Sequence, residues 1–392
     1  MPNVYCKYLT AMVLALMLGM AVFQDYISKN IRASLPETHR ALIRTCIPRN
    51  KSKNYVLVTG AAGFIGFHTA LELAKRGDVV VGLDNFNDYY PVSLKIARAS
   101  SLLEAGIAVI KADVNDLTIV RRMFDYCRFT HVIHFAAQAG VRYAARNPMS
   151  YVQSNIAGTV SLLEAIRQQP ELPKLVYASS SSVYGNSMRL PFEENDRADR
   201  PASLYAASKR SQEMITQAYS SMYKISATGL RFFTVYGPFG RPDMSVMSFT
   251  NKILQGSPIK LFKQPDGSDL ARDFTYISDI VRGVLGALDF TPSSGDHSFR
   301  HTVFNLGNSK VVDVSSMLSI LQGLLHKNAT VEKYSLPSVG EVLVTNADIS
   351  SAHAAFEYEP QVDIQSGLRL FLSWYLSIDS KLRHDLSQYI PD

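Results

Sequence analysis

Residues 55–66 read YVLVTGAAGFIG, an apolar run followed by glycines at Gly60, Gly63 and Gly66. The run Tyr55–Thr59 predicts a buried β-strand, and the residues through Lys75 predict a helix after it. A glycine-rich turn between a strand and a helix lets backbone amides approach a pyrophosphate at the helix N-terminus. The stretch therefore indicates a dinucleotide-binding unit. Its candidate cofactor contacts are Gly60, Gly63, Phe64, Ile65 and Gly66.

An acidic residue follows the next expected strand. The strand Val79–Leu83 ends at Asp84, 24 residues after Gly60. A carboxylate at this position can accept hydrogen bonds from both ribose hydroxyls of NAD, and it would repel the extra phosphate of NADP. The sequence therefore predicts NAD as the cofactor, with Asp84 and the neighbouring Asn85 as contacts.

Strands and helices continue to alternate, which predicts a doubly wound parallel Rossmann sheet in the α/β class. Further strands are expected at Ala108–Ala112, His131–Ala136, Leu175–Ser179 and Ala227–Phe232, and long helices at Pro148–Gln168 and Ser203–Tyr223. After Phe233 the alternation loosens into a smaller mixed α/β region. Its helices are expected at Val246–Gln255, Ser278–Leu288, Val314–His326 and Gly367–Leu376. The expected division is 1–53, an N-terminal segment; 54–233, the NAD-binding domain; and 234–392, mainly a substrate-binding region.

Residues at the ends of these strands should pass beside the cofactor. Asp113, with Val114 after it, is placed to meet the adenine ring. His134 is expected to be packed rather than catalytic. The remaining candidates follow the fourth strand and are Phe135, Ala136, Ala137 and Gln138.

The N-terminal segment differs in composition from the rest of the chain. It holds eight basic and two acidic residues, whereas residues 54–392 hold 32 of each sign and are neutral. Nucleic-acid binding by the body is therefore not expected. The uncharged run Leu9–Phe23 is short for a bilayer span. It is expected to be a short membrane anchor, with a cleaved signal peptide or a buried or disordered extension as the alternatives.

The cysteine pattern excludes two classes of protein. The chain has three cysteines, Cys6, Cys46 and Cys127, and no CxxC pair. This count argues against a disulfide scaffold and against a zinc site built from cysteines. No metal site is expected.

Tyr205 and Lys209 are four residues apart on an expected helix, so they share one face. With 20 tyrosines in the chain, one Tyr-x-x-x-Lys pair is expected by chance. The pair therefore indicates a catalytic site only if other site residues accompany it. The fifth strand ends in the hydroxyl-rich run ASSSSVYG at residues 178–185. Hydroxyls at the carboxyl end of a parallel strand face the cofactor crevice.

These features together resemble the extended short-chain dehydrogenase/reductase family, and most closely its nucleotide-sugar 4-epimerases that act on UDP-glucuronate. The resemblance spans residues 54 to about 375. The matching segments are Gly60–His68, Asp84–Tyr90, Ala136–Tyr143, Asn147–Gly158, Arg231–Met244 and Arg272–Asp279.

The resemblance implies a mechanism. Tyr205 acts as the base on the 4-hydroxyl of the sugar while the C4 hydride passes to NAD. Lys209 favours the phenolate by its charge and binds the nicotinamide ribose. Ser180 is the hydroxyl partner, where many relatives carry threonine. The 4-keto sugar then rotates within the site, so that its other face is presented to the reduced cofactor and receives the hydride.

The two positions that follow Ser180 distinguish the different reactions catalysed within the family. Dehydratases carry Asp-Glu there and decarboxylases carry Glu at the second position, whereas this chain has Ser181 and Ser182. Neutral hydroxyls, with Thr234, would hold a substrate carboxylate and suppress loss of CO₂. Interconversion of UDP-glucuronate and UDP-galacturonate is therefore expected. UDP-glucose 4-epimerase, UDP-glucuronate decarboxylase and a non-enzymatic NAD-bound scaffold are the alternatives.

The resemblance also assigns contacts and partners. Arg272 and Arg241 should bind the UDP end, since guanidinium groups suit diphosphates. Arg231 is an equal candidate for a substrate contact or a structural residue. Asn155 should touch both cofactor and sugar. Relatives are commonly homodimers through two long helices, and plant relatives suggest a single-pass type II Golgi protein, although the basic residues after the apolar run favour the cytoplasmic face.

Overall fold

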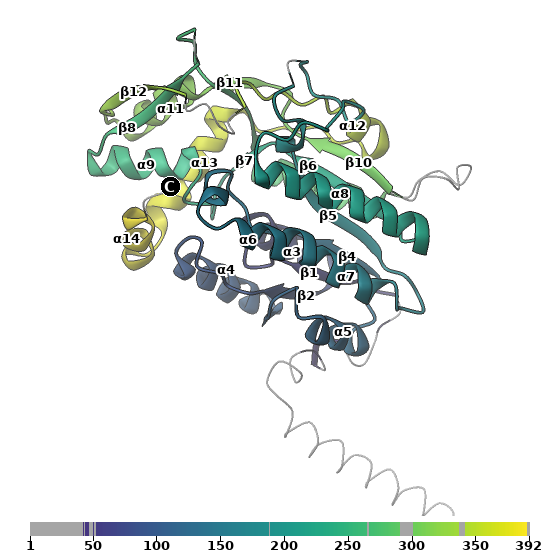
Figure 1. Cartoon of the computed structure of the whole chain (residues 1–392). Coiled ribbons are helices and arrows are strands. Elements are labelled where there is room, and N and C mark those ends of the chain that lie inside the picture. Colours follow the sequence, from purple (N-terminus) through teal and green to yellow (C-terminus); the bar gives the residue numbers. More distant parts are fainter. Residues whose placement is uncertain are drawn as a thin grey trace, which may run out of the picture.

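A seven-stranded parallel sheet forms the centre of the molecule (Figure 1). The computed structural model describes residues 42, 44–46, 50, 52–187, 189–264, 266–290, 301–336 and 342–389. The strand order is β10-β6-β5-β4-β1-β2-β3. The strands are β1 (Tyr55–Thr59), β2 (Val79–Asp84), β3 (Ala108–Lys111), β4 (His131–His134), β5 (Lys174–Ser180), β6 (Ala227–Phe232) and β10 (His301–Leu306). The predicted doubly wound Rossmann sheet is confirmed.

Alternating side chains of the strands divide the core between the two faces of the sheet. Val56 and Val58 belong to the apolar cluster on one face, and Leu57 belongs to the cluster on the other. The first face is covered by α3 (Phe64–Arg76), α4 (Val92–Glu104) and α10 (Ile277–Asp289). The second is covered by α5 (Leu117–Tyr126), α7 (Gly158–Ile166) and α8 (Leu204–Tyr223). Because both faces are covered, side chains on both faces of a central strand such as β1 are buried.

The helix expected at Pro148–Gln168 is divided in the structure. It comprises α6 (Pro148–Tyr151), a π-helical turn at Val152–Ala157, and α7. A π-turn adds a residue to the helical repeat and changes which side chains point inward. Asn155 lies in this turn and is fully buried. Apolar periodicity gave no sign of the extra residue.

The chain after residue 233 builds the smaller region and also returns to the large sheet. The returning elements are α10 and β10, and β10 pairs with β6 as a seventh strand that the sequence analysis missed. The smaller region contains a three-stranded sheet, β11-β9-β7, and a two-stranded sheet, β12-β8. Its elements are β7 (Thr234–Tyr236), α9 (Ser245–Gln255), β8 (Ile259–Lys263), β9 (Ala271–Tyr276), β11 (Val311–Asp313), α11 (Val314–Leu325), β12 (Val331–Ser335), α12 (Ser350–Phe356), α13 (Ile364–Ser377) and α14 (Ser380–Gln388).

A disulfide joins the segment before the sheet to the body. Cys46 is bonded to Cys127, which follows α5, and both residues are buried. Leu42 is also buried and belongs to the same apolar cluster as Cys127. The cysteine count had argued only against a scaffold of several bridges, and it gave no sign of this single one. The core thus includes residues that the sequence analysis assigned to the N-terminal segment.

The expected single-pass type II membrane topology is contradicted. Within the described residues, no helix combines the length and the apolar character needed to cross a membrane. The expected anchor, Leu9–Phe23, lies outside the described residues.

Candidate active site

The carboxyl ends of β1, β4 and β5 bring the predicted site residues to one edge of the sheet. The strands run parallel with Thr59 beside His134 and His134 beside Tyr177. The loops after these strands therefore meet, although they lie far apart in the sequence. His134 itself is buried, with its ring nitrogens bonded to Thr59 and Thr159 at 2.8 and 3.2 Å. Its imidazole is packed within the sheet.

The turn after β1 is shaped by its glycines. Gly60 has φ of +71°, and a Cβ there would lie 2.7 Å from the amide nitrogen of Ala136. A Cβ on Gly66 would lie 2.2 Å from the carbonyl oxygen of Gly60. Only glycine allows this approach between the turn, the helix and the β4 loop.

The first turn of α3 leaves its amide groups open to a ligand. Gly63 precedes the helix and offers no side chain to cap it. The N-terminal amides of a helix together with its dipole favour an anionic group. This end of α3 therefore fits the pyrophosphate of a dinucleotide.

Asp84 connects the end of β2 to the glycine-rich turn. Its two carboxylate oxygens accept from the backbone amides of Ala62 and Phe86, at 3.0 and 2.8 Å. A carboxylate has about four acceptor positions, so capacity remains for ribose hydroxyls. Asn85 donates to Asp113 at 2.9 Å, so these two candidate contacts are adjacent.

Asn155 holds the β4 loop against α8. Its side-chain oxygen accepts from the amide of Gln138 at 2.7 Å, and its nitrogen donates to the Gln138 carbonyl and to Ser208 Oγ, at 3.1 and 2.9 Å. These bonds occupy both N–H donors of the amide. These bonds position the β4 loop against α8, and the expected contact of Asn155 with cofactor and sugar stays a prediction.

Ser180, Tyr205 and Lys209 come together where β5 meets the start of α8. Ser203 caps this helix by accepting from the Ala206 amide at 3.1 Å. Lys209 donates to the carbonyl of Ala178 in β5 at 2.8 Å and to Gln212 at 3.0 Å. The Ser180 hydroxyl lies near enough to the Tyr205 hydroxyl to lower its pKa. An ammonium has three donors, so the described contacts leave one for a ligand.

Burial changes the protonation of both members of the pair. It raises the pKa of Tyr205, while the Ser180 hydroxyl and the positive charge of Arg241 act in the opposite direction. It lowers the pKa of Lys209 to about 7, against the negative charge of Glu213. Among the described groups, the charge of Arg241 lowers the Tyr205 pKa and that of Asp243 raises it. The role of Lys209 toward the phenolate stays a prediction.

The serine run continues from the end of β5 into a short 3₁₀ turn, Ser181–Tyr184. Ser180 Oγ accepts from the Ser182 amide and bonds its hydroxyl, both at 3.2 Å. Ser181 and Ser182 are half-buried. Ser182 therefore lies beside Ser180.

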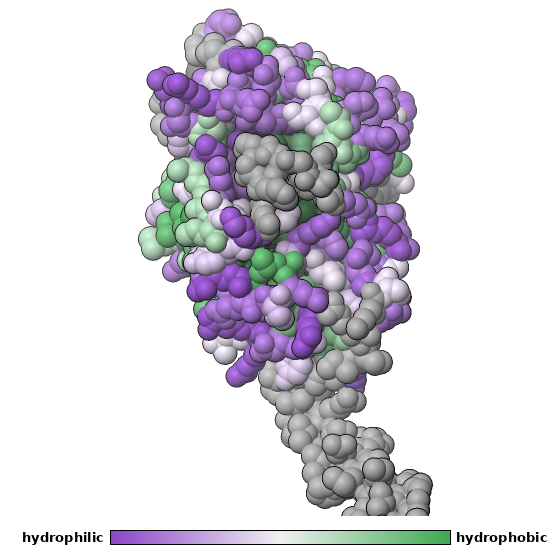
Figure 2. All heavy atoms as spheres, turned by 90° about the vertical axis from the view of Figure 1, so that its right-hand side faces the viewer, coloured by the Kyte–Doolittle hydropathy of each residue, from purple (hydrophilic) through white to green (hydrophobic). Residues whose placement is uncertain are grey.

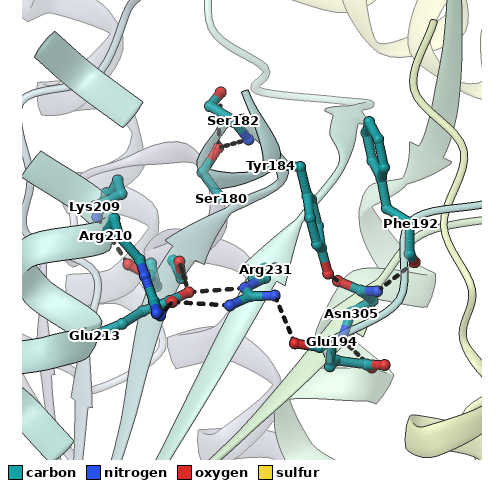
Figure 3. A network of polar contacts seen from close by, with 12 residues as sticks. Ser180, Ser182, Tyr184, Phe192, Glu194, Lys209, Arg210, Glu213, Arg231 and Asn305 are labelled. Atoms are coloured by element: carbon teal, nitrogen blue, oxygen red, sulfur yellow. Dashed lines mark hydrogen bonds and ion pairs between the residues drawn. The ribbon is translucent and has the colours of Figure 1, made fainter. Parts of the chain in front are cut away.

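Arg231 is committed to a buried network (Figure 3). Its guanidinium donates twice to Glu213 and also to the carbonyl of Glu194. The ring of Tyr184 lies 4.8 Å from the guanidinium carbon. Glu213 also accepts from Ser179 at 2.5 Å and from Arg210 at 2.7 Å. Of the two roles left open for Arg231, these contacts favour the structural one.

The two other candidate arginines lie in the part of the chain after β6. Arg241 pairs with Asp243, whose carboxylate also accepts from Tyr89 at 3.1 Å. Arg272 belongs to β9 and donates to the carbonyls of Ala271 and Leu343. The strand β9 pairs with β7, which begins at Thr234. Thr234 and Arg272 therefore belong to the same small sheet.

Residues 56–307 match the model of the NAD dependent epimerase/dehydratase family. The match includes the glycine-rich turn, Asp84, the serine run and the Tyr205–Lys209 pair.

The chain belongs to the NAD-dependent epimerase/dehydratase family.

Relatives in this family share most of its length. UDP-glucuronate 4-epimerase 1 of Arabidopsis thaliana is 52% identical over 328 residues, which cover 82% of this chain and 76% of the relative. The crystal structure of UDP-glucuronic acid 4-epimerase from Bacillus cereus, in complex with UDP-glucuronic acid and NAD, is 34% identical with a TM-score of 0.74. It covers 82% of this chain and 98% of the other. UDP-glucose 4-epimerase from Thermotoga maritima is similar at 28% identity and a TM-score of 0.70, over 82% of this chain and 98% of its own.

Some residues of this epimerase/dehydratase site were missed by the sequence analysis. Glu213 follows Lys209 by four residues on α8, so helical spacing would have placed it one turn further along the same face. Asp243 and Tyr89 lie within segments that carry the family resemblance, yet neither was singled out. Arg98 of α4 was not singled out, since the contacts that join it to the two loops are with backbone carbonyls far away in the sequence.

Proposed function

We propose that this chain interconverts UDP-glucuronate and UDP-galacturonate by transient oxidation at C4 of the sugar. The observation that carries the proposal is the proximity of Ser180, at the end of β5, to Tyr205 at the start of α8, with Lys209 one turn further on the same helix. A base and a hydroxyl partner are thus held together at the cofactor edge of the sheet. Relatives named for this reaction at about half identity support the same conclusion.

The residues at the sheet edge fit NAD. A backbone cradle at Gly60 and Gly66 leaves no room for a Cβ, and the open helix end suits the pyrophosphate. The carboxylate of Asp84 suits the adenosine ribose. Asn85, Asp113 and Val114 would border the adenine, and the loop from Phe135 to Gln138 would border the nicotinamide half. When bound, NAD supplies the acceptor, and later the donor, of the C4 hydride.

Tyr205 takes the proton of the 4-hydroxyl and later returns one to the product. Its raised pKa disfavours the phenolate, so positive charge near the ring is needed. Arg241 supplies part of that charge, and the oxidised nicotinamide would supply more. Ser180 bonds the same oxygen of the sugar and shortens the proton path. Lys209, already fixed by Ala178 and Gln212, directs its remaining donor to the nicotinamide ribose.

Ser181, Ser182 and Thr234 hold the substrate carboxylate in this proposal. The 4-keto sugar formed from glucuronate is a β-keto acid, which loses CO₂ readily. Neutral hydroxyls can bond the carboxylate in an orientation that does not align the breaking bond with the ketone. No acidic side chain occupies the two positions after Ser180, so proton delivery for elimination of water is also lacking there.

Arg241 and Arg272 are assigned to the UDP end of the substrate. Arg241 follows a tightly held loop, and Arg272 lies in the sheet that contains Thr234. Arginine presents a fork of donors that matches a diphosphate. Arg231 is left out of this group because its guanidinium is buried and paired with Glu213.

Product analysis tests the proposed function. Purified protein is incubated with UDP-glucuronate, with and without added NAD, and the nucleotide sugars are separated by chromatography. UDP-galacturonate is the expected product. UDP-xylose would identify a decarboxylase instead. Turnover of UDP-glucose without turnover of UDP-glucuronate would identify a neutral-sugar epimerase, and no product from either would favour an NAD-bound scaffold.

We further propose a homodimer through α8 and through the helical segment 148–166, which comprises α6, the π-helical turn and α7. These elements expose large apolar side chains, and Figure 2 shows apolar side chains gathered at the left margin of one face, level with α8 in Figure 1. The exposed side chains are Met149, Val152, Leu204, Met214, Met222 and Tyr223. A second copy would cover them through the same helices. Light scattering should give twice the chain mass for the natural sequence, and Met214→Glu with Met222→Glu should give the monomer mass.

A further inference from the structure

Arg98 is a buried cation near the glycine-rich turn. It lies in α4, its side chain is fully buried, and its guanidinium donates to neutral oxygens. Within the described part of the chain, no carboxylate is paired with it. Taking a guanidinium out of water is costly unless its donors are well bonded, so each of these bonds matters.

The acceptors of Arg98 belong to two loops of the proposed site. Nη1 donates to the carbonyl of Ala62 in the glycine-rich turn at 2.9 Å. Nη2 donates to the carbonyls of Phe239 and Gly240, at 2.6 and 3.2 Å. Tyr90 accepts a further bond at 2.8 Å. One planar group thus joins the cofactor turn to a loop 141 residues further along the chain than Arg98.

The loop is held at three successive carbonyls. His68 of α3 bonds the carbonyl of Pro238 at 2.8 Å, next to the two that Arg98 bonds. Phe239 adopts φ of +53°, a conformation that a non-glycine residue rarely takes without support. Its ring packs 4.9 Å from both Phe67 and Trp374. Arg98 therefore stabilises a backbone shape that the loop would not favour alone.

The next residue in the chain is Arg241. Its guanidinium is paired with Asp243 and lies over the ring of Tyr89 at 5.9 Å. The positions of the Phe239 and Gly240 carbonyls fix the position of the Arg241 backbone, because Arg241 directly follows Gly240. A shift of the loop would move this guanidinium away from its ligand.

We propose that Arg98 is a positioning residue for the UDP end of the substrate, which it orients by fixing the loop that carries Arg241 to the glycine-rich turn. The inference rests on the proposed role of Arg241 toward UDP. Lysine cannot replace Arg98, because an ammonium lacks the planar fork that bonds two carbonyls on one side and a third on the other.

Arg98→Lys tests the inference, since it keeps the charge and most of the volume. We expect it to raise the KM for UDP-glucuronate and the Kd for UDP by about tenfold, the loss of one to two charge-assisted bonds. We expect kcat to fall by less than about threefold, because Arg98 does not contact Ser180, Tyr205 or Lys209 and the oxidised nicotinamide still supplies positive charge beside Tyr205. Tyr90→Phe is the matched control. It removes one acceptor but leaves both loops bonded, and should change KM by less than about twofold.

A double-mutant cycle with Arg241→Gln separates positioning from general support of the fold. Calorimetric titration with UDP is done on the NAD-loaded proteins. If Arg98 acts through Arg241, Arg241→Gln weakens UDP binding by about tenfold alone but by less than about threefold in the Arg98→Lys protein. If Arg98→Lys does not fold, Arg98→Gln is used in the same cycle.

The outcomes distinguish this inference from the proposed function. Additive effects of the two substitutions, or equal losses in kcat and in affinity, would overturn the positioning role of Arg98 while leaving the epimerase proposal intact. An unchanged UDP affinity in Arg241→Gln alone would remove Arg241 from the UDP site, and the inference would fail with it. Failure of the natural enzyme to convert UDP-glucuronate would overturn the proposed function directly.

Discussion

Glu213 accepts two hydrogen bonds from the guanidinium of Arg231, both at 2.9 Å, in a pair that solvent barely reaches. Burial by itself would raise the pKa of Glu213, but the hydrogen bonds and charge of Arg231 bring it below its usual range. The same carboxylate opposes the lowering of the Lys209 pKa. A structural ion pair therefore also influences the charge of a residue in the proposed catalytic group.

Replacing Glu213 by glutamine should destabilise the protein by about 3–5 kcal/mol, because it leaves Arg231 buried without a counter-charge. Denaturant unfolding measures this loss. The matched control is the exposed pair of Arg189 with Glu193. Glu193→Gln should lower stability by less than about 1 kcal/mol. Equal losses from the two substitutions would show that the buried pair is not special.

Tyr205→Phe should keep the fold and bound NAD but reduce epimerase activity by at least about 100-fold, since proton removal is lost. Chromatography of the nucleotide sugars gives the rate, and the absorbance of bound cofactor gives the NAD content. Tyr151→Phe is a suitable control, because its ring lies 6.2 Å from Tyr205 but is not assigned to the chemistry. Activity of Tyr205→Phe within tenfold of the natural enzyme would remove Tyr205 from the mechanism.

Ser182→Glu should weaken binding of UDP-glucuronate while leaving binding of UDP almost unchanged. Two like charges about 4 Å apart repel by about 4 kcal/mol at an effective dielectric constant of about 20. Calorimetric titration of both ligands gives the comparison. Ser182→Gln adds similar bulk without charge and controls for steric effects. If the glutamate variant loses affinity equally for both ligands, or for neither, Ser182 does not face the carboxylate.

Acid should destabilise the protein through its buried histidines. Burial lowers the pKa of His134 to about 3, and those of His68, His131 and His301 to about 4. An unfolded chain binds these protons near pH 6.5, so stability is complete above that pH and falls as the pH drops toward 4. For the fully buried His134 the slope is about 1.4 kcal/mol per pH unit.

Unfolding free energies measured between pH 7.5 and 4.5 check this expectation. His134→Gln should reduce the slope below pH 6.5, whereas a substitution at the exposed His326 should not. An identical slope in the two variants would mean that His134 does not contribute to acid unfolding.

Two truncations should separate the core residues from the rest of the N-terminal segment. Removal of residues 1–41 retains Leu42 and Cys46, whereas removal of residues 1–53 discards both and the disulfide with them. We expect both proteins to be active, since all proposed site residues lie after residue 53. The shorter protein should have the lower melting temperature under oxidising conditions. Equal melting temperatures would show that Leu42 and the disulfide do not stabilise the body.

The sequence predicted the sheet well because local patterns specify it. The first strand was predicted to its exact ends, Tyr55 and Thr59, and Asp84 was placed at the end of β2. An apolar run bounded by glycine or polar residues predicts a buried strand from neighbouring residues alone, without knowledge of distant contacts. Strand β10 escaped notice because it follows the looser pattern after residue 233.

Contacts between distant residues account for most of what was missed. The pairing of Cys46 with Cys127, 81 residues away, cannot be deduced from a count of three cysteines. Three of the acceptors of Arg98 are backbone carbonyl oxygens, which every residue has and no sequence pattern marks. For Arg231, the choice between a substrate contact and a structural role depended on the position of Glu213, which the sequence does not show. Assignment of the remaining site residues to cofactor or sugar stays a prediction.

The Cys46–Cys127 bond makes a closed covalent ring of the chain between these residues. The ring contains β1, β2 and β3, and with them the glycine-rich turn and Asp84. A protease that cuts one peptide bond within the ring opens it but releases no fragment, so the protein keeps its full mass on a non-reducing gel. Reduction then separates two pieces whose sizes locate the cut. Proteolytic nicking within this ring would thus stay hidden until the disulfide is reduced.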